Sequence, residues 1–244
     1  MGGFVPVQGS VASIYVDEFE LTQQSSGAEL NVEIDELSYN IMGQSATQKE
    51  VAAPNFTIPH HGYYTGRGAS GDMGYFEDTI QKRLGTALPV TVTLLLGTVA
   101  YTLIGTWGSQ MTIDAPVDGL ITIDGNWSSP DSVVRGAAVP GANYTNGQNG
   151  TPIDLGGIGK ANGAVFHVSG FADLSAGVEL VTVKLQTSAT SGGTYTDWLT
   201  TTFQKPGAKL VTGTNNLQPW VRVVVSFTAG VPGPVTAFAS IKYL

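Results

Sequence analysis

The chain contains few residues whose chemistry could build a metal or catalytic site. It has no cysteine, and its three histidines are His60, His61 and His167. Adjacent side chains on an extended chain point to opposite sides, so His60 and His61 do not converge on one ion, and no cysteine or paired carboxylate completes a ligand set. His167 stands alone in a strand pattern. We interpret all three as structural or surface residues and predict neither a metal nor a cofactor.

Two aspartate pairs and one glycine-rich segment are the other candidates for chemistry. Asp114 with Asp118, or Asp124 with Asp131, has the residue type needed for calcium binding or glycoside hydrolysis. Loops use aspartate so often for turns that we interpret both pairs as turn residues. The segment 65–71 could bind an anion at a helix N-terminus, but a cap and a flexible loop explain it better. No nucleophile elbow, P-loop or dinucleotide fingerprint is present, so we predict that the chain is not an enzyme.

Aromatic residues raise the alternative of a carbohydrate-binding module. Trp107, Trp127, Trp198 and Trp220, with Tyr195, could form a sugar-stacking platform. Tryptophans spread over a whole chain are more often core anchors, because buried aromatic rings dominate packing energy. The module interpretation applies chiefly to the second half of the chain.

A row of carboxylates follows an alternating pattern that starts at Glu29. Its apolar side holds Leu30, Val32 and Ile34, and its polar side holds Glu29, Asn31, Glu33 and Asp35. The alternation predicts a half-buried strand. Its outer row is either a solvated face or, if copies form a ring, the negative lining of a pore that repels DNA phosphates.

The pattern predicts one amphipathic helix, over residues 72–84. Asp72 is a candidate N-cap and Gly85 a candidate stop, while Met73, Phe76, Ile80 and Leu84 fall on one face. Before it, residues 40–70 read as a long connection, and such loops usually bind something. We predict an inter-subunit loop whose candidate contact residues are Met42, Pro54, Pro59, His60, His61, Tyr63, Tyr64 and Arg67.

The remaining elements are predicted to be strands. Residues 89–96 and 99–107 form one expected hairpin across Gly97 and Thr98, and residues 110–114 and 120–124 form another across Pro116 and Gly119. Turn residues fill segment 138–150, which predicts a linker. Six short strands follow, over residues 164–168, 179–186, 198–203, 209–212, 220–227 and 236–243. Their spacing predicts an antiparallel sandwich or jelly roll.

Composition narrows the class of protein. Only 12% of residues are charged and 32 are glycine, as in β-proteins that assemble side by side, and secreted β-sandwiches share this composition. Residues 1–150 carry 15 acidic and 5 basic side chains, and residues 151–244 carry 4 acidic and 6 basic ones. An acidic first half argues against binding nucleic acid by phosphate neutralisation. Pro89 and Gly97 interrupt the longest apolar run, so we expect no membrane helix, and no signal peptide pattern is present.

The order of these pieces resembles the tail tube protein, or major tail protein, of long-tailed, siphovirus-like bacteriophages. The segment Val16-Asp17-Glu18-Phe19-Glu20-Leu21-Thr22 is similar to the family's opening "VDEFDLS", with Glu20 where aspartate is expected. The acidic strand, the long loop, the short helix and the hairpin ending in Ala100-Tyr101 follow in order. Val133-Val134-Arg135-Gly136 resembles the step that closes this unit, and the strands after residue 151 resemble C-terminal β-domains of the same phage proteins.

The resemblance implies a structural virion protein located in the phage tail and assembled in the host cytoplasm. Its copies are expected to form hexameric rings that stack into a hollow tube for DNA delivery, without specific DNA binding. The implied partners are other copies and the tape measure, tail terminator and distal tail proteins, and no membrane. Glu29, Glu33 and Asp35 then become candidates for the lumen.

We therefore predict a mainly β fold: a tail-tube-type sandwich or barrel with one flanking helix, followed by a C-terminal antiparallel sandwich. Residues 1–150 form the expected tube domain, with an N-terminal arm over residues 1–12, and residues 151–244 form the second domain. Two other functions stay open. A capsid decoration protein, or another virion sandwich protein, shares the composition, and a carbohydrate-binding module shares the aromatic residues of the second half.

Overall fold

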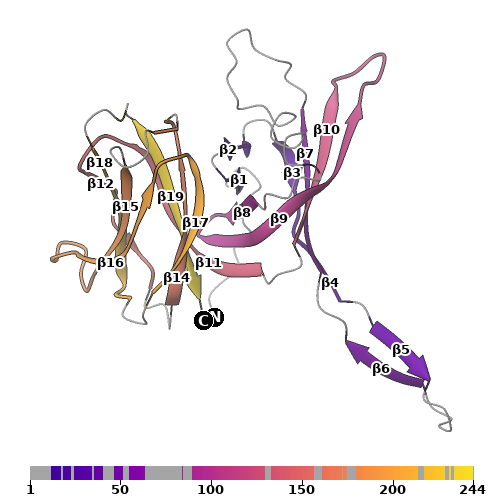
Figure 1. The fold of residues 1–244 in the computed structure, drawn as a ribbon, viewed down its shortest axis with the longest axis horizontal. Coiled ribbons are helices and arrows are strands. Elements are labelled where there is room, and N and C mark those ends of the chain that lie inside the picture. Colours follow the sequence, from indigo (N-terminus) through magenta and orange to yellow (C-terminus); the bar gives the residue numbers. More distant parts are fainter. Residues whose placement is uncertain are drawn as a thin grey trace, which may run out of the picture. The chain divides into compact units, whose positions relative to one another are not determined.

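The computed structural model is built almost entirely of antiparallel strands (Figure 1), which confirms the mainly β class. It describes residues 12–17, 19–22, 25–34, 36–40, 47–51, 55–63, 84, 90–129, 133–156, 161–171, 173–174, 180–213, 217–228, 231 and 234–243. The predicted helix over residues 72–84 lies outside these ranges except for Leu84, which forms an isolated parallel bridge with Gly108. The N-terminal arm before Ala12 also lies outside them.

The chain divides into two compact units. Unit 1 comprises Met1–Thr22, Thr91–Thr102 and Val134–Leu244, and unit 2 comprises Gln23–Val90 and Leu103–Val133. Strands from both sides of residue 150 pair within unit 1, since β11 (Val133–Tyr144) runs antiparallel to β19 (Val235–Tyr243). That residues 151–244 form a separate domain, able to fold on its own, therefore stays a prediction.

Unit 1 is built around a β-sandwich, as the strand spacing of the second half predicts. One layer contains β17 (Gly207–Thr212), β14 (Ala161–Ser169), β19 and β11. The other contains β12 (Gln148–Asn149), β18 (Trp220–Phe227), β15 (Val181–Ser188) and β16 (Thr196–Phe203), with β13 (Ile153–Asp154) paired to β18. Figure 1 shows the two layers side by side. All six predicted strands of this half are confirmed.

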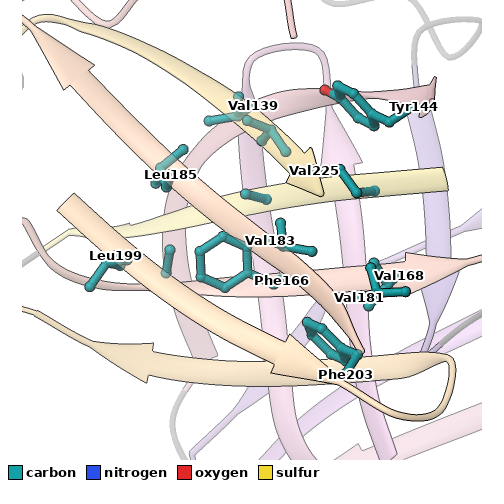
Figure 2. Close-up of a cluster of buried hydrophobic side chains, with 14 of the residues drawn as sticks. Val139, Tyr144, Phe166, Val168, Val181, Val183, Leu185, Leu199, Phe203 and Val225 are labelled. Carbon is teal, nitrogen blue, oxygen red and sulfur yellow. The ribbon is translucent and has the colours of Figure 1, made fainter. Parts of the chain in front are cut away.

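Alternation along the strands fills the space between these layers. On β15, Val181, Val183 and Leu185 are fully buried, while the residues between them are half-exposed. Phe166 from β14 and Phe203 from β16 meet them from other strands in one continuous core (Figure 2). Burying a large apolar side chain contributes about 1.5–3 kcal/mol, so this cluster is the main source of stability in unit 1.

The predicted linker over residues 138–150 is wrong for its first part. Residues 138–144 belong to β11 and pair with β19, and Tyr144 is only 2% exposed. The strand accommodates its turn-like residues through a register shift between Val139 and Ala142, which brackets Pro140 and Gly141. A bulge of this kind lets a strand carry a proline that cannot donate to the ladder.

The opening motif forms a hydrogen-bonded turn in unit 1. It joins β1 (Ala12–Val16) to β2 (Phe19–Glu20), and β1 also pairs with β8 (Val90–Leu96). Asp17 has a φ of 48°, and its carboxylate accepts a hydrogen bond of 2.8 Å from the backbone N–H of Thr91. Aspartate tolerates this left-handed conformation better than most residues. The motif's aspartate is therefore a structural residue.

His167 is buried beneath this turn. Its Nδ1–H donates to the Asp17 carbonyl at 2.7 Å, which leaves Nε2 to accept from the Thr93 hydroxyl at 2.8 Å. Thr93 also shares a hydrogen bond of 2.9 Å with Thr102. Burial lowers the pKa of His167 to about 4, and the bond to Asp17 opposes that shift. The ring is neutral at pH 7, as expected for a structural histidine.

The sheet of unit 2 has a long hairpin at one side. It contains β9 (Val99–Asp114), β10 (Thr122–Ser129), β7 (Asn55–Tyr63) and, along the far side of β7, β3 (Ser25–Ala28) and β4 (Asn31–Glu33). The predicted hairpins β8–β9 and β9–β10 are both confirmed. The two strands expected over residues 99–107 and 110–114 are one strand, because β9 continues through Gly108 and Ser109.

The predicted unstructured connection over residues 40–70 is wrong where the structure describes it. It holds β6 (Thr47–Val51), which pairs with β5 (Glu36–Asn40) as a separate hairpin, and β7, which lies inside the sheet. The prolines and glycines in this segment are typical of loops, so the sequence pattern did not indicate these strands. Pro59 has no N–H to donate, and the neighbouring β3 and β4 are interrupted opposite it, so a central strand can accommodate it.

Candidate functional site

The sheet of unit 2 presents one face of hydroxyl, amide and carboxylate groups, which we call the polar face. Directly opposed residues share a face, and the register pairs Asp124 with His61 and Thr112. Other members on the same face are Asn31, Glu33, Asn55, Thr57, Pro59, Tyr63, Trp107, Gln110, Asp114, Thr122, Asn126 and Ser128. None of these residues is lysine or arginine. The face is therefore polar and negatively charged.

The opposite face of this sheet is buried in its middle. Ile58, Ile123 and Trp127 are all 0% exposed, and they occupy alternate positions on β7 and β10. His60 also lies on this side, fully buried, with its Nε2 hydrogen-bonded to the Ser25 hydroxyl. Burial, with a smaller contribution from His61, lowers the pKa of His60 to about 3. The sheet is thus amphipathic.

His61 and Asp124 form the one described ion pair on the polar face. The distance from His61 Nδ1 to Asp124 Oδ1 is 2.7 Å, and both side chains are 47% exposed. An exposed pair of this kind contributes little stability. The two histidines therefore point to opposite sides of β7, as predicted, and do not form a common metal site.

The acidic row is only partly a strand. Glu29 and Glu33 are exposed, Glu33 lies on the polar face, and Asp35 lies outside the described residues. The expected burial of the apolar side is wrong for Val32 and Ile34, which are 52% and 57% exposed. Val32 lies in β4, which ends at Glu33, and Ile34 lies just beyond that end.

The inter-subunit loop candidates separate into three groups. Met42, Pro54, Tyr64 and Arg67 lie outside the described residues. Pro59, His61 and Tyr63 lie on the polar face of β7, and Tyr63 is 43% exposed. His60 is buried inside unit 2 and offers no side-chain surface to a neighbour. The structure brings some of these residues together on a strand rather than on a loop.

Large exposed apolar residues concentrate in unit 2. Among the described residues, eight of the nine lie there, and Leu210 of unit 1 is the ninth. The eight are Val32, Ile34, Tyr63, Trp107, Ile113, Val117, Leu120 and Ile121. Single exposed apolar residues are ordinary, and only contiguous apolar surface marks a contact site. Four of the eight, Ile113, Val117, Leu120 and Ile121, follow one another closely in the chain.

The tip of the β9–β10 hairpin is a candidate functional surface that we did not predict from the sequence. It comprises residues 113–121 and exposes 99% of Val117 and 73% of Leu120. Asp114 and Asp118 are exposed beside them. The sequence signal was present, since leucine, isoleucine and valine surround a Pro116/Gly119 turn where polar residues are usual.

The other candidates for chemistry do not assemble. Within the described ranges, no group of three or more histidines and carboxylates could hold a metal ion. Asp131 and the glycine-rich segment 65–71 lie outside those ranges. In the part of the chain that the structure describes, no helix is long and apolar enough to cross a membrane.

The aromatic residues proposed for sugar stacking do not share an open platform. Trp127 is fully buried, and Trp198 packs against the core of unit 1. The guanidinium of Arg222 lies 4.2 Å from the ring centroid of Tyr195 and covers one side of it. Arg222 also donates two hydrogen bonds to Gln186. These contacts favour structural roles, so the carbohydrate-binding alternative gains no support.

No protein-family model matches the sequence, and no curated protein matches it either.

Three solved structures resemble the chain coarsely. The tube-terminating cap of the anti-feeding prophage has a TM-score of 0.41 and 12% identity, over 56% of this chain and 95% of the cap protein. A chain from the virion of a native gene transfer agent has a TM-score of 0.36 and 8% identity, over 52% of this chain and 95% of its own. A chain from the extended PVC sheath-tube complex, an extracellular contractile injection system, has a TM-score of 0.38 and 13% identity, over 54% and 92%. All three TM-scores lie below 0.5, so these likenesses carry no argument about function.

Proposed function

We propose that this chain is a structural subunit of a phage-type tail tube, in which copies form hexameric rings that stack around a channel for DNA. The observation that carries the proposal is the amphipathic sheet of unit 2. Its polar face bears carboxylates without described lysine or arginine, and the same unit holds eight of the nine exposed large apolar residues. A subunit that contacts neighbours and also lines a channel needs both features.

The polar face suits the lumen for electrostatic reasons. DNA carries one negative charge per roughly 1.7 Å of helix axis and binds clustered lysine and arginine strongly. A lining of hydroxyls, amides and carboxylates gives DNA no such anchor and repels its phosphates. Glu29, Glu33 and Asp35 remain the acidic candidates for this lining, and Asp124 joins them from the structure.

Electron microscopy of the purified protein, with its mass measured by light scattering, tests the assembly. We expect rings or tubes with a central hole and sixfold views. Stable trimers without a pore would overturn the proposal and favour a decoration protein of the capsid.

Charge reversal tests the lumen separately. Glu29→Lys and Glu33→Lys together should leave rings intact but slow DNA delivery from assembled particles, because the new lysines bind phosphates. Asp154→Lys, at an exposed carboxylate of unit 1, is the matched control. Normal delivery by the double variant would remove the acidic residues from the lumen.

We also propose that the β5–β6 hairpin bridges successive rings, as expected for part of the inter-subunit loop. These strands form a two-stranded sheet of their own, so they can be shortened without removing a strand from the main sheet. Replacing residues 36–51 by a short glycine-serine linker should block tube growth while rings still form. Unimpaired polymerisation would remove the hairpin from the ring-to-ring contact.

A further inference from the structure

The tip of the β9–β10 hairpin is a preformed apolar projection with acidic flanks. Val117 and Leu120 are 99% and 73% exposed, and Asp114 and Asp118 stand beside them. The turn leaves no room for a side chain at Gly119, since a Cβ added there would lie 2.9 Å from Cγ of Pro116. A short proline-containing turn has few conformations to lose on binding, which favours its use as a contact.

A groove in unit 1 has the complementary character. It has a volume of about 530 Å³, and its apolar lining includes the partly exposed Leu180, Pro206 and Ala208, together with Phe203, which is only 2% exposed. Lys205 and Lys209 also line it, and the described lining residues include no carboxylate, although Asp173 pairs with Lys205. Ligand pockets in proteins typically have volumes of roughly 300–1,000 Å³. The groove is therefore large enough to receive apolar side chains.

The two lysines are placed differently around the groove. The Nζ of Lys209 lies 4.7 Å from the ring centroid of Phe203 and is held there by a bond to the Thr202 carbonyl. Lys205 pairs with Asp173 at 3.3 Å, but these side chains are 74% and 66% exposed. Such an exposed pair is weak, so Lys205 can turn towards another carboxylate at little cost.

We propose that the hairpin tip of one copy docks into this groove on a neighbouring copy, with Val117 and Leu120 against the apolar lining and Asp118 facing Lys205. The charges argue for this occupant. In the described stretch 90–129 the chain has three aspartates and no lysine or arginine, whereas the described charged residues that line the groove, Lys205 and Lys209, are both basic. Complementary charges fix the register of a contact, and buried apolar side chains supply most of its affinity.

The contact is heterologous, because it joins different surfaces of the two copies. Such contacts close into rings or propagate along an axis. The inference rests on the proposed function only in requiring that copies associate, and it identifies the surfaces through which they do so.

Engineered cysteines provide a direct test, because the chain has none of its own. Full-length Val117→Cys is mixed with full-length Ala208→Cys and treated with a short bis-maleimide reagent, and the linked peptides are identified by mass spectrometry. We expect cross-linking between the two variants to exceed that of the control mixture at least roughly tenfold. The control pairs Val32→Cys, which is also at an exposed apolar site, with Ala208→Cys.

A charge swap and an apolar substitution provide a second readout by sedimentation velocity. Val117→Ser with Leu120→Ser should weaken self-association by roughly tenfold or more. Asp118→Lys and Lys205→Asp should each weaken it by about two- to fivefold, and the two together should restore it.

Three outcomes overturn this contact. If the wild-type protein forms rings but Val117→Cys links to Ala208→Cys no better than the control does, the contact is wrong while the tube proposal stands. If a single chain carrying both cysteines links only within itself, the tip docks in its own chain. If the wild-type protein does not self-associate at high concentration and the cysteine variants do not cross-link, both proposals fail.

Discussion

The two units treat their apolar residues in opposite ways. Unit 1 closes two sheets over a continuous core, where Phe166 is 0% and Phe203 is 2% exposed. Unit 2 buries Trp127 and Ile123 on one face of its sheet but leaves Val117 and Leu120 exposed at its hairpin tip. Among the described residues, unit 1 therefore buries nearly all of its large apolar side chains, whereas unit 2 leaves eight of them exposed.

The largest effect on stability is expected from a substitution that creates a cavity in the core of unit 1. Phe166→Ala should lower the free energy of unfolding by about 3–5 kcal/mol, because it leaves a cavity among buried side chains. Ile113→Ala in unit 2 is the matched control, since Ile113 is 45% exposed and should change stability by less than about 0.5 kcal/mol. Urea unfolding measures both. Equal losses in the two variants would contradict the contrast between the units.

Acidification should destabilise both units through their buried histidines. The pKa values of His167 and His60 in the folded chain are about 4 and about 3, below the ordinary 6.5. The unfolded chain therefore binds more protons below pH 6.5, so stability falls as the pH drops from 6.5 towards each folded value. Each histidine accounts for roughly 3–5 kcal/mol at most.

Replacing one histidine separates the two contributions. His167→Gln keeps an amide that can donate to the Asp17 carbonyl but cannot titrate. Its unfolding free energy should fall less between pH 7 and pH 4.5 than that of the wild-type chain, as measured by urea unfolding at both pH values. An unchanged pH dependence would show that His167 does not contribute to it.

Glycines test how tightly each unit is packed. A Cβ added to Gly136 in unit 1 would lie 1.8 Å from the backbone oxygen of Ile241, so Gly136→Ala should cost about 1–3 kcal/mol or more. A Cβ added to Gly27 in unit 2 has no atom within 4 Å. Gly27→Ala should therefore change the thermal midpoint little. A similar loss in both variants would show that unit 2 is packed as closely as unit 1.

The smallest effect is expected at the exposed hairpin tip. Val117→Ser should leave the unfolding free energy within about 0.5 kcal/mol of the wild-type value, because the side chain is 99% exposed. The measurement is made at low protein concentration, where copies are apart. A larger loss would mean that the tip is packed within its own chain.

The strands of the second half could be predicted because local rules and packing agree there. Val181, Val183 and Leu185 alternate with polar residues, and the sandwich buries that same side. The two hairpins around Gly97 and Gly119 were predictable for a similar reason, since a turn separates two β-rich runs. In these segments the pairing partner is close in sequence or the pattern is strong.

Pairing with strands distant in sequence determined which of the turn-rich segments became strands, and sequence patterns could not predict this. Residues 138–144 carry turn residues, yet β19 lies almost a hundred residues away in the sequence and recruits them into a sheet. In the same way, β10 recruits β7 despite Pro59 and Gly62. A distant strand supplies hydrogen bonds that outweigh weak local propensity, because β-propensity depends on context.

The candidate surfaces divide along the same line. The sequence by itself determined the lack of cysteine, the acidic first half and the alternation that makes strands amphipathic. Only the tertiary structure decided which residues share the polar face, that Val32 and Ile34 are exposed, and that an apolar tip and a lysine-lined groove exist on the same chain. A face or a groove is made from strands that are distant in sequence, so its composition follows from register and burial rather than from local order.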